Sequence, residues 1–197
     1  MRYRLLLIPG ISLALAACGG VGQSSVGSHA ASSGGSAAPE PSGGTTTGDI
    51  PDNAVFLTYH AANPAFSIQY VEGWQVTPQP DGVVIRDKDS SETVLIVGAQ
   101  TDVARYVAST DLPALNTQPG FSLVKQDTVA VGGSKYVHLA YTVTSPPDAV
   151  TGKQLPLTVD RYYVPGSGGL AIVILATPSG VDNVDAFRQM IESAKWS

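Results

Sequence analysis

The fold of this chain is encoded most clearly in Leu157-Thr-Val-Asp-Arg-Tyr-Tyr-Val164, Pro165-Gly-Ser-Gly-Gly169 and Leu170-Ala-Ile-Val-Ile-Leu-Ala176. The first and third segments are rich in β-branched and aromatic residues, which favour strands. The glycine-rich segment between them is a turn signal, so the stretch predicts a long antiparallel hairpin. Because its second strand is apolar at successive positions, and therefore on both faces, we expect helices or loops to cover both sides of the sheet.

Further strands are predicted on the N-terminal side of this hairpin. Apolar and polar residues alternate in Phe66-Ser-Ile-Gln-Tyr70, which is the period of a half-buried strand. Pro80-Asp-Gly82 is a turn signal before Val83-Val-Ile85. The continuous run Thr93-Val-Leu-Ile-Val97 is typical of a strand covered on both faces.

A second hairpin is predicted between residues 121 and 143. Residues 121–131 form its first strand, Gly132-Gly133 its turn, and Lys135–Val143 its return strand. Since side chains alternate between the faces of a strand, Tyr136 and His138 lie on the same face.

Two helices complete the pattern. Thr101 can cap the first helix, and Val103, Tyr106 and Val107 share one of its faces. For the helix near the C-terminus, Asp182 is the expected cap. The spacing of its apolar residues predicts a buried stripe of Val184, Phe187, Ile191 and Ala194, with Met190 beside it. The predicted fold class is α/β in the α+β sense, an antiparallel sheet sandwiched by helices.

Residues 1–17 have the layout of a bacterial signal peptide. Arg2 and Arg4 precede a short apolar run that ends in small residues, and the run is shorter than the roughly 20 residues that span a bilayer. The sequence Leu-Ala-Ala-Cys then looks like a lipobox, in which cleavage occurs before Cys18 and its sulfur, nucleophilic as a thiolate, accepts a diacylglycerol. The residues of the predicted signal-peptidase recognition site are Leu15, Ala16 and Ala17. Cys18 is the only cysteine of the sequence. The alternative interpretation is a secreted protein without a lipid anchor, in which this cysteine has no role.

Residues 18–50 are predicted to be a disordered Gly/Ser/Thr/Pro tether and residues 51–197 one domain. At about 5–6 Å × √n, a glycine- and serine-rich tether of this length reaches roughly 30 Å. Two acyl chains on Cys18 are a stable anchor. We therefore expect an exported protein on the outer face of the cell membrane, or on the outer membrane if the host has one.

The charge excludes one class of partner. The formal net charge is −5, and no run of lysine or arginine is present. Nucleic-acid binding needs concentrated positive charge, so it is not expected.

Motifs at both ends of the domain resemble the PsbP-like family. The stretch Phe66-Ser-Ile-Gln-Tyr-Val-Glu-Gly-Trp74 is similar to that family's F-S-I-x-Y-P-x-G-W, with Val71 where proline is usual. Asp160-Arg-Tyr-Tyr-Val164, Ala176-Thr-Pro178 and Phe187-Arg-Gln-Met-Ile-Glu-Ser-Ala-Lys-Trp196 are similar to its closing hairpin and helix. The resemblance implies a PsbP-like α/β/α sandwich over about residues 55–197.

The same resemblance implies a role in docking onto other proteins. The family includes an extrinsic photosystem II subunit and, in a related branch, a nuclear-import factor that binds a small GTPase. It implies no metal or docking residue at a particular position here, and a photosynthetic role does not follow from it.

Motifs that would indicate catalysis are weak. Ser122-Leu-Val-Lys125 spells S-x-x-K, but that chemistry needs a helix, and this segment is predicted to be a strand. His60 and His138 are expected to be ordinary sheet residues rather than bases or ligands. Asp87-Lys-Asp89 lacks the further acids and the glycine of a calcium loop. We expect no catalytic set, no metal site and no cofactor.

Three functions are open at this stage. The leading hypothesis is a non-enzymatic module of the cell envelope that binds a protein partner. The second is a carrier of a small apolar ligand in a pocket between sheet and helix, and the third is a hydrolytic enzyme with scattered residues. The residues proposed to contact a ligand or partner are Tyr136, His138, Tyr162 and Tyr163.

Overall fold

The computed structural model describes residues 48–62 and 64–197. The predicted signal peptide, Cys18 and the predicted tether up to residue 47 lie outside the described residues. Among the helices of the described part, none is long and apolar enough to cross a membrane.

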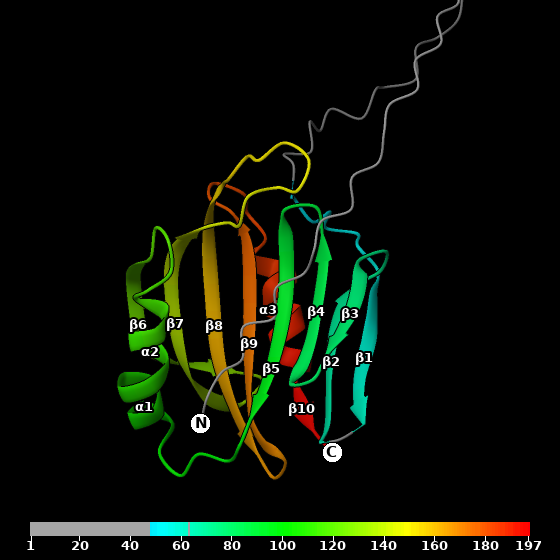
Figure 1. Cartoon of the computed structure of the whole chain (residues 1–197). Helices are drawn as coiled ribbons and strands as arrows, with labels where there is room; N and C mark the ends of the chain where they lie inside the picture. The colour runs from blue at the N-terminus through cyan, green and yellow to red at the C-terminus, as the bar shows by residue number, and fades with distance from the viewer. Residues whose placement is uncertain (1–47, 63) are drawn as a thin grey trace, which may run out of the picture. The chain divides into compact units, whose positions relative to one another are not determined.

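A seven-stranded antiparallel sheet forms the centre of the domain, with the strand order β3-β4-β5-β9-β8-β7-β6 (Figure 1). A smaller sheet has the order β1-β2-β10. The strands are β1 (Phe56–Ala62), β2 (Ala65–Val71), β3 (Gln75–Gln79), β4 (Gly82–Asp87), β5 (Ser90–Val97), β6 (Ser122–Val131), β7 (Ser134–Thr144), β8 (Pro156–Gly166), β9 (Gly169–Pro178) and β10 (Lys195–Trp196). Both predicted hairpins are present, as β6–β7 and β8–β9.

Helices cover both faces of the large sheet, as Figure 1 shows. On one face lies a helical segment made of α1 (Val103–Tyr106), a π-helical turn η1 (Val107–Asp111) and α2 (Leu112–Leu115). On the other face lies α3 (Val184–Ser193). The predicted fold class, an antiparallel sheet sandwiched by helices, is confirmed.

Strand β9 explains why both faces must be covered. Val173 and Leu175 belong to the core on the α3 side, together with Phe66 and Ile68 of β2. Ile172 belongs to the core on the side of the α1–α2 segment. The strand is therefore apolar at successive positions because each face meets its own core.

Four details differ from the sequence-based expectations. The residue at the N-cap position of α3 is Asn183, not the predicted Asp182. Asp102, not Thr101, caps α1, because its carboxylate accepts a hydrogen bond from the backbone N–H of Arg105. Val184 is 61% exposed, whereas Met190 is fully buried. The buried stripe of α3 is rotated toward Met190 because the helix packs against β2 as well as the large sheet.

The run from Thr93 to Val97 is covered less completely than predicted. Val94 is buried on the α3 side, but the other side chains of the run are only half-buried. The core under the α1–α2 segment takes its buried sheet residues from β7, β8 and β9. The outer face of β4 and β5 is therefore left partly open.

Candidate functional site

The predicted contact residues divide between the two faces of the sheet. Tyr136 and Tyr162 pack against the core on the α3 side, and His138 stacks on Tyr162 with ring centroids 4.6 Å apart. Tyr163 lies on the opposite face, in the core under the α1–α2 segment. The four residues therefore do not form one contact surface.

His138 joins three neighbouring strands. Its Nδ1 lies 3.0 Å from a carboxylate oxygen of Asp127 on β6, and its Nε2 lies 2.8 Å from a carboxylate oxygen of Asp160 on β8. Asp127 also pairs with Lys125 Nζ at 2.5 Å. Because ionised carboxylates only accept hydrogen bonds, both ring nitrogens donate, which is the geometry of the charged imidazolium.

The electrostatics agree with this arrangement. Burial lowers the pKa of His138, but the carboxylates of Asp160 and Asp127 raise it by more, so the net pKa lies above the ordinary value. Lys125 first, and His138 second, hold the pKa of Asp127 below its usual value. With both nitrogens engaged, the ring is placed to brace strands rather than to accept a proton from a substrate.

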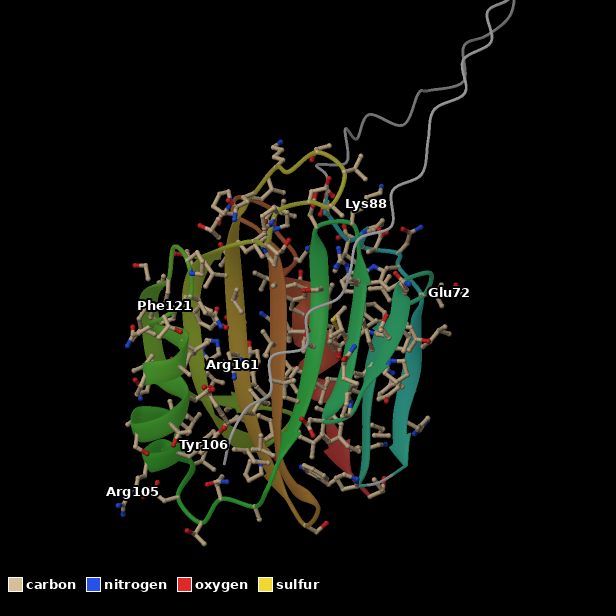
Figure 2. The ribbon with its side chains drawn as sticks, viewed as in Figure 1. Glu72, Lys88, Arg105, Tyr106, Phe121 and Arg161 are labelled. Atoms are coloured by element: carbon tan, nitrogen blue, oxygen red, sulfur yellow. The ribbon has the colours of Figure 1, made fainter. Side chains whose placement is uncertain are left out.

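A second polar cluster fastens the helical segment to the other face. Arg161 Nε and Nη2 donate to the two carboxylate oxygens of Asp111 at 2.7 and 2.9 Å. The hydroxyl of Tyr163 donates to the same carboxylate. Figure 2 shows Arg161 on the sheet beside the segment that carries Tyr106. Burial lowers the pKa of Arg161, but Asp111, Tyr163 and Tyr141 together raise it by more, so the guanidinium stays charged.

Glu92 is a carboxyl group inside the core with no hydrogen-bond partner. It is fully buried on β5, where its neighbours across the strands are Ile85 and Leu175. Both side-chain oxygens lack a hydrogen-bond partner. Burial raises the pKa of Glu92 well above its usual value, because a buried site without a partner disfavours the charged form.

A third polar cluster holds the backbone at the start of the domain. Asn183 Oδ1 accepts a hydrogen bond from the backbone N–H of Ile50 at 2.8 Å, and its Nδ2 donates to the carbonyl of Gly48 at 2.8 Å. The hydroxyl of Ser90 donates to the same carbonyl at 2.7 Å. Ile50 is buried in the core on the α3 side. The last residues of the predicted tether, 48–50, are therefore docked on the domain.

The weaker motifs lie apart from these clusters. Ser122 and Lys125 lie on β6, beside an irregularity in its pairing with β7, and not at the start of a helix. His60 is an exposed residue of β1. Asp87 is the last residue of β4, and Asp89 lies in the turn between β4 and β5. In residues 48–62 and 64–197, no three His, Cys, Asp or Glu side chains gather as they would around a metal ion.

Sequence reasoning missed Asp111, Arg161, Glu92 and Asn183 as members of buried clusters. A signal existed for one of them, because Arg161 is a charged residue inside the predicted strand from Leu157 to Val164. Its partner could not be found in the same way, since Asp111 and Arg161 are 50 positions apart.

Comparisons with known proteins found similar solved structures at low sequence identity. No protein-family model matches this sequence, and no curated protein matches it. The solution structure of cyanobacterial PsbP from Synechocystis is 18% identical and covers 80% of this chain and 100% of its own, with a TM-score of 0.49. It bears the name of the family that the terminal motifs resemble.

Two other solved structures are similar over most of their length. PA94, a protein of unknown function from Pseudomonas aeruginosa, is 18% identical and covers 70% of this chain and 94% of its own, with a TM-score of 0.43. LpqN, which is involved in cell envelope biogenesis of Mycobacterium tuberculosis, is 16% identical and covers 73% of this chain and 85% of its own, with a TM-score of 0.38. At these identities the likeness concerns the fold alone.

Proposed function

We propose that this protein is an exported lipoprotein that acts as a non-enzymatic accessory module of the cell envelope and binds a protein partner there. In this proposal the diacylglyceryl group of Cys18 holds the chain in the membrane. The predicted tether links Cys18 to the domain, and the domain carries the binding surface.

The docked segment 48–50 is the observation that carries this proposal. Asn183 and Ser90 bind its backbone by three hydrogen bonds, and the side chain of Ile50 is buried. A domain on a tether needs a fixed point of attachment, because pulling on the chain would otherwise peel its first strand from the sheet. Here residues 48–50, which precede β1, are held by side chains from two other elements, β5 and the start of α3.

The state of the polar clusters supports a binding role over catalysis. The ring nitrogens of His138 and the guanidinium group of Arg161 are the groups that could act in catalysis, and both are hydrogen-bonded to carboxylates. The carboxylates hold each side chain in its charged form. A hydrolytic site needs a base with a free lone pair beside a nucleophile. The carrier hypothesis is weakened because Tyr163 and the other proposed lining residues lie on opposite faces.

The test is a crosslinked pull-down of the full chain from native membranes, with a Cys18→Ala variant as control, analysed by mass spectrometry for proteins and lipids together. We expect the wild-type chain to carry the diacylglycerol mass, to fractionate with membranes and to recover one protein partner reproducibly. The Cys18→Ala variant should lose both the lipid mass and the membrane fraction.

Two results would contradict the proposal. If the wild-type chain carries no lipid and fractionates like the variant, the anchor is wrong. If a small apolar molecule co-purifies and no protein does, the carrier function replaces partner binding.

A further inference from the structure

A groove of about 680 Å³ lies between the β4–β5 hairpin and the loop that joins β7 to β8. Figure 1 shows this loop beside the turn between β4 and β5, and Figure 2 shows Lys88 at that turn. Apolar side chains of Val84, Leu155 and Leu157 line part of the groove. It lies where the α1–α2 segment leaves the outer face of β4 and β5 partly open.

Three cations also line the groove: Arg86, Lys88 and Lys153. Among the ion pairs of the described residues, none involves these three side chains. Positive charge is scarce in this chain, which has 11 lysines and arginines against 16 aspartates and glutamates. A cluster of unpaired cations in such a chain is therefore a local feature that favours an anionic ligand.

The acidic residues of the groove have other tasks. Asp148 accepts hydrogen bonds from the backbone N–H groups of Val150 and Thr151 and from the Thr151 hydroxyl, so its carboxylate shapes the loop. Asp89 occupies the turn between β4 and β5, next to Lys88. Both carboxylates line the same groove as the three cations, and the hydrogen bonds from Thr151, with a smaller contribution from the charge of Arg86, lower the pKa of Asp148.

Lys88 stands in a backbone conformation that disfavours a side chain. Its φ is +46°, and it is the only non-glycine residue of the described chain with a positive φ. Glycine would adopt this conformation without strain. A strained residue that the rest of the fold holds in place is a sign that its side chain is used. Lys88 also lines the two hollows on the other sides of the turn.

We infer that this groove docks an extended acidic segment of the partner protein, with carboxylates at Arg86, Lys88 and Lys153 and apolar side chains over Val84 and Leu157. The inference rests on the proposed function, because it names the surface by which the domain binds its partner. A membrane is a poorer fit, because the occupant must enter a groove and a membrane surface is flat.

The test is site-specific photocrosslinking in the full lipidated chain. A p-benzoylphenylalanine is placed at Ala149, an exposed residue of the groove, and in a second strain at Val124, which is 69% exposed on β6. Each probe is combined with Lys88→Gly and with Lys135→Ala, which removes one exposed lysine from another hairpin. The crosslinked peptide is then sequenced by mass spectrometry.

We expect the Ala149 probe to crosslink to one envelope protein through a segment that carries several carboxylates. Lys88→Gly should lower this yield about fivefold, while Lys135→Ala leaves it unchanged. Because Lys88→Gly also relieves the strained backbone, its melting midpoint should be equal to that of the wild type or higher. If Lys88→Gly loses crosslinking but keeps its stability, the lost yield reflects weaker binding and not a folding defect.

Other outcomes overturn the inference and are distinguishable from failure of the proposed function. Crosslinks to a protein from Val124 alone would leave partner binding intact but place it elsewhere. Crosslinks from Ala149 to lipid, to a segment without carboxylates, or with a yield insensitive to Lys88→Gly would each contradict the acidic docking groove. No protein crosslink from either position, together with an empty pull-down, would contradict the proposed function itself.

Discussion

At the scale of single residues, the pKa values of Glu92 and His138 are both raised, but for different reasons. Burial alone raises the pKa of Glu92, because no partner stabilises its charged form. Two carboxylates raise the pKa of His138 against the effect of burial. In both cases the folded protein binds the proton more tightly than the unfolded chain, so stability is lost as pH rises. The pH range in which this stability is lost differs between Glu92 and His138.

Replacing Glu92 by methionine should stabilise the domain. The buried carboxyl has no hydrogen-bond partner, so an apolar side chain of similar size should raise the free energy of unfolding by about 1–3 kcal/mol at neutral pH. In the wild type, the contribution of Glu92 is full below the ordinary glutamate pKa of 4.5 and falls as pH rises above that value toward the raised folded pKa. Urea unfolding over this range checks both effects.

The Glu92→Gln variant is the control for the pH effect. It cannot ionise, so it should remove the pH dependence while still burying an amide without a partner. A methionine variant that is less stable than the wild type and has the same dependence of stability on pH would contradict the hypothesis of a buried Glu92 carboxyl group with a raised pKa and no hydrogen-bond partner.

Replacing His138 should change stability in a higher pH window. The imidazolium contribution is full below the ordinary histidine pKa of 6.5 and is lost as pH rises through the raised folded pKa. His138→Gln should lose about 1 kcal/mol at acidic pH, because its carboxylate partners are part-exposed, and should lose little at alkaline pH. The titration of the ring by NMR gives the folded pKa directly. A folded pKa below the ordinary histidine value would refute the bracing role of Asp127 and Asp160.

At the scale of elements, the α1–α2 segment depends on one buried ion pair. Its π-helical turn ends at Asp111, whose carboxylate receives two hydrogen bonds from Arg161. A π-helical turn interrupts the regular hydrogen bonding of a helix, so the segment relies on its side-chain attachments. Arg161 comes from β8, in the middle of the sheet.

Removing one member of that pair should loosen the segment. Asp111→Asn should cost about 3–5 kcal/mol, since it leaves the guanidinium of Arg161 buried without its counter-charge. Hydrogen exchange should accelerate over residues 103–115 more than over α3, which packs on the opposite face. The double variant Asp111→Asn with Arg161→Met should recover part of the loss. Equal acceleration in α3 would mean that the two faces unfold together.

Trp196 is the second attachment between elements. Its indole N–H donates to the carbonyl of Val164 at 3.1 Å, and its ring lies across the β8–β9 turn. A methyl group on Gly168 would lie 2.5 Å from the indole. Gly168→Ala should therefore destabilise the domain by about 1–3 kcal/mol. Gly98→Ala, where an added methyl group meets nothing within 4 Å, is the matched control for thermal unfolding.

At the scale of the whole molecule, the attachment of the tether is the feature that links the fold to the proposed function. Asn183 stands at the start of α3, yet its amide binds the backbone at residues 48 and 50 instead of capping the helix. The most C-terminal helix thus holds the first residues of the domain. This closure brings together segments that are 133 positions apart.

Breaking this closure should free the start of the domain. Asn183→Ala removes both hydrogen bonds and should cost about 1–3 kcal/mol, because the backbone groups are buried. Limited proteolysis should then cut after residue 48 sooner than in wild type. Asp182→Ala, one position away and exposed, is the control. Unchanged cleavage in Asn183→Ala would show that burial of Ile50 alone holds the segment.

Local chemistry in the sequence determined β2 and the strands from β4 to β9, the two long hairpins, the C-terminal helix and the need to cover both faces of β9, but it did not predict β1 or β10. These features follow from β-branched runs, alternation, glycine turns and amphipathic spacing, which act over a few residues. The caps were misplaced by one position and Val184 was wrongly put in the core, because neighbouring polar residues compete for the same cap and packing sets the final rotation of a helix.

Only the tertiary structure decided which polar residues meet. Asp127, His138 and Asp160 come from three strands, and Asp111 and Arg161 from a helix and a strand. The burial of Glu92 and the gathering of Arg86, Lys88 and Lys153 in one groove depend in the same way on strand order and on the path of a loop. The physical reason is that sequence pattern reports the local preferences of the backbone, whereas a buried contact depends on long-range pairing that local propensity does not specify.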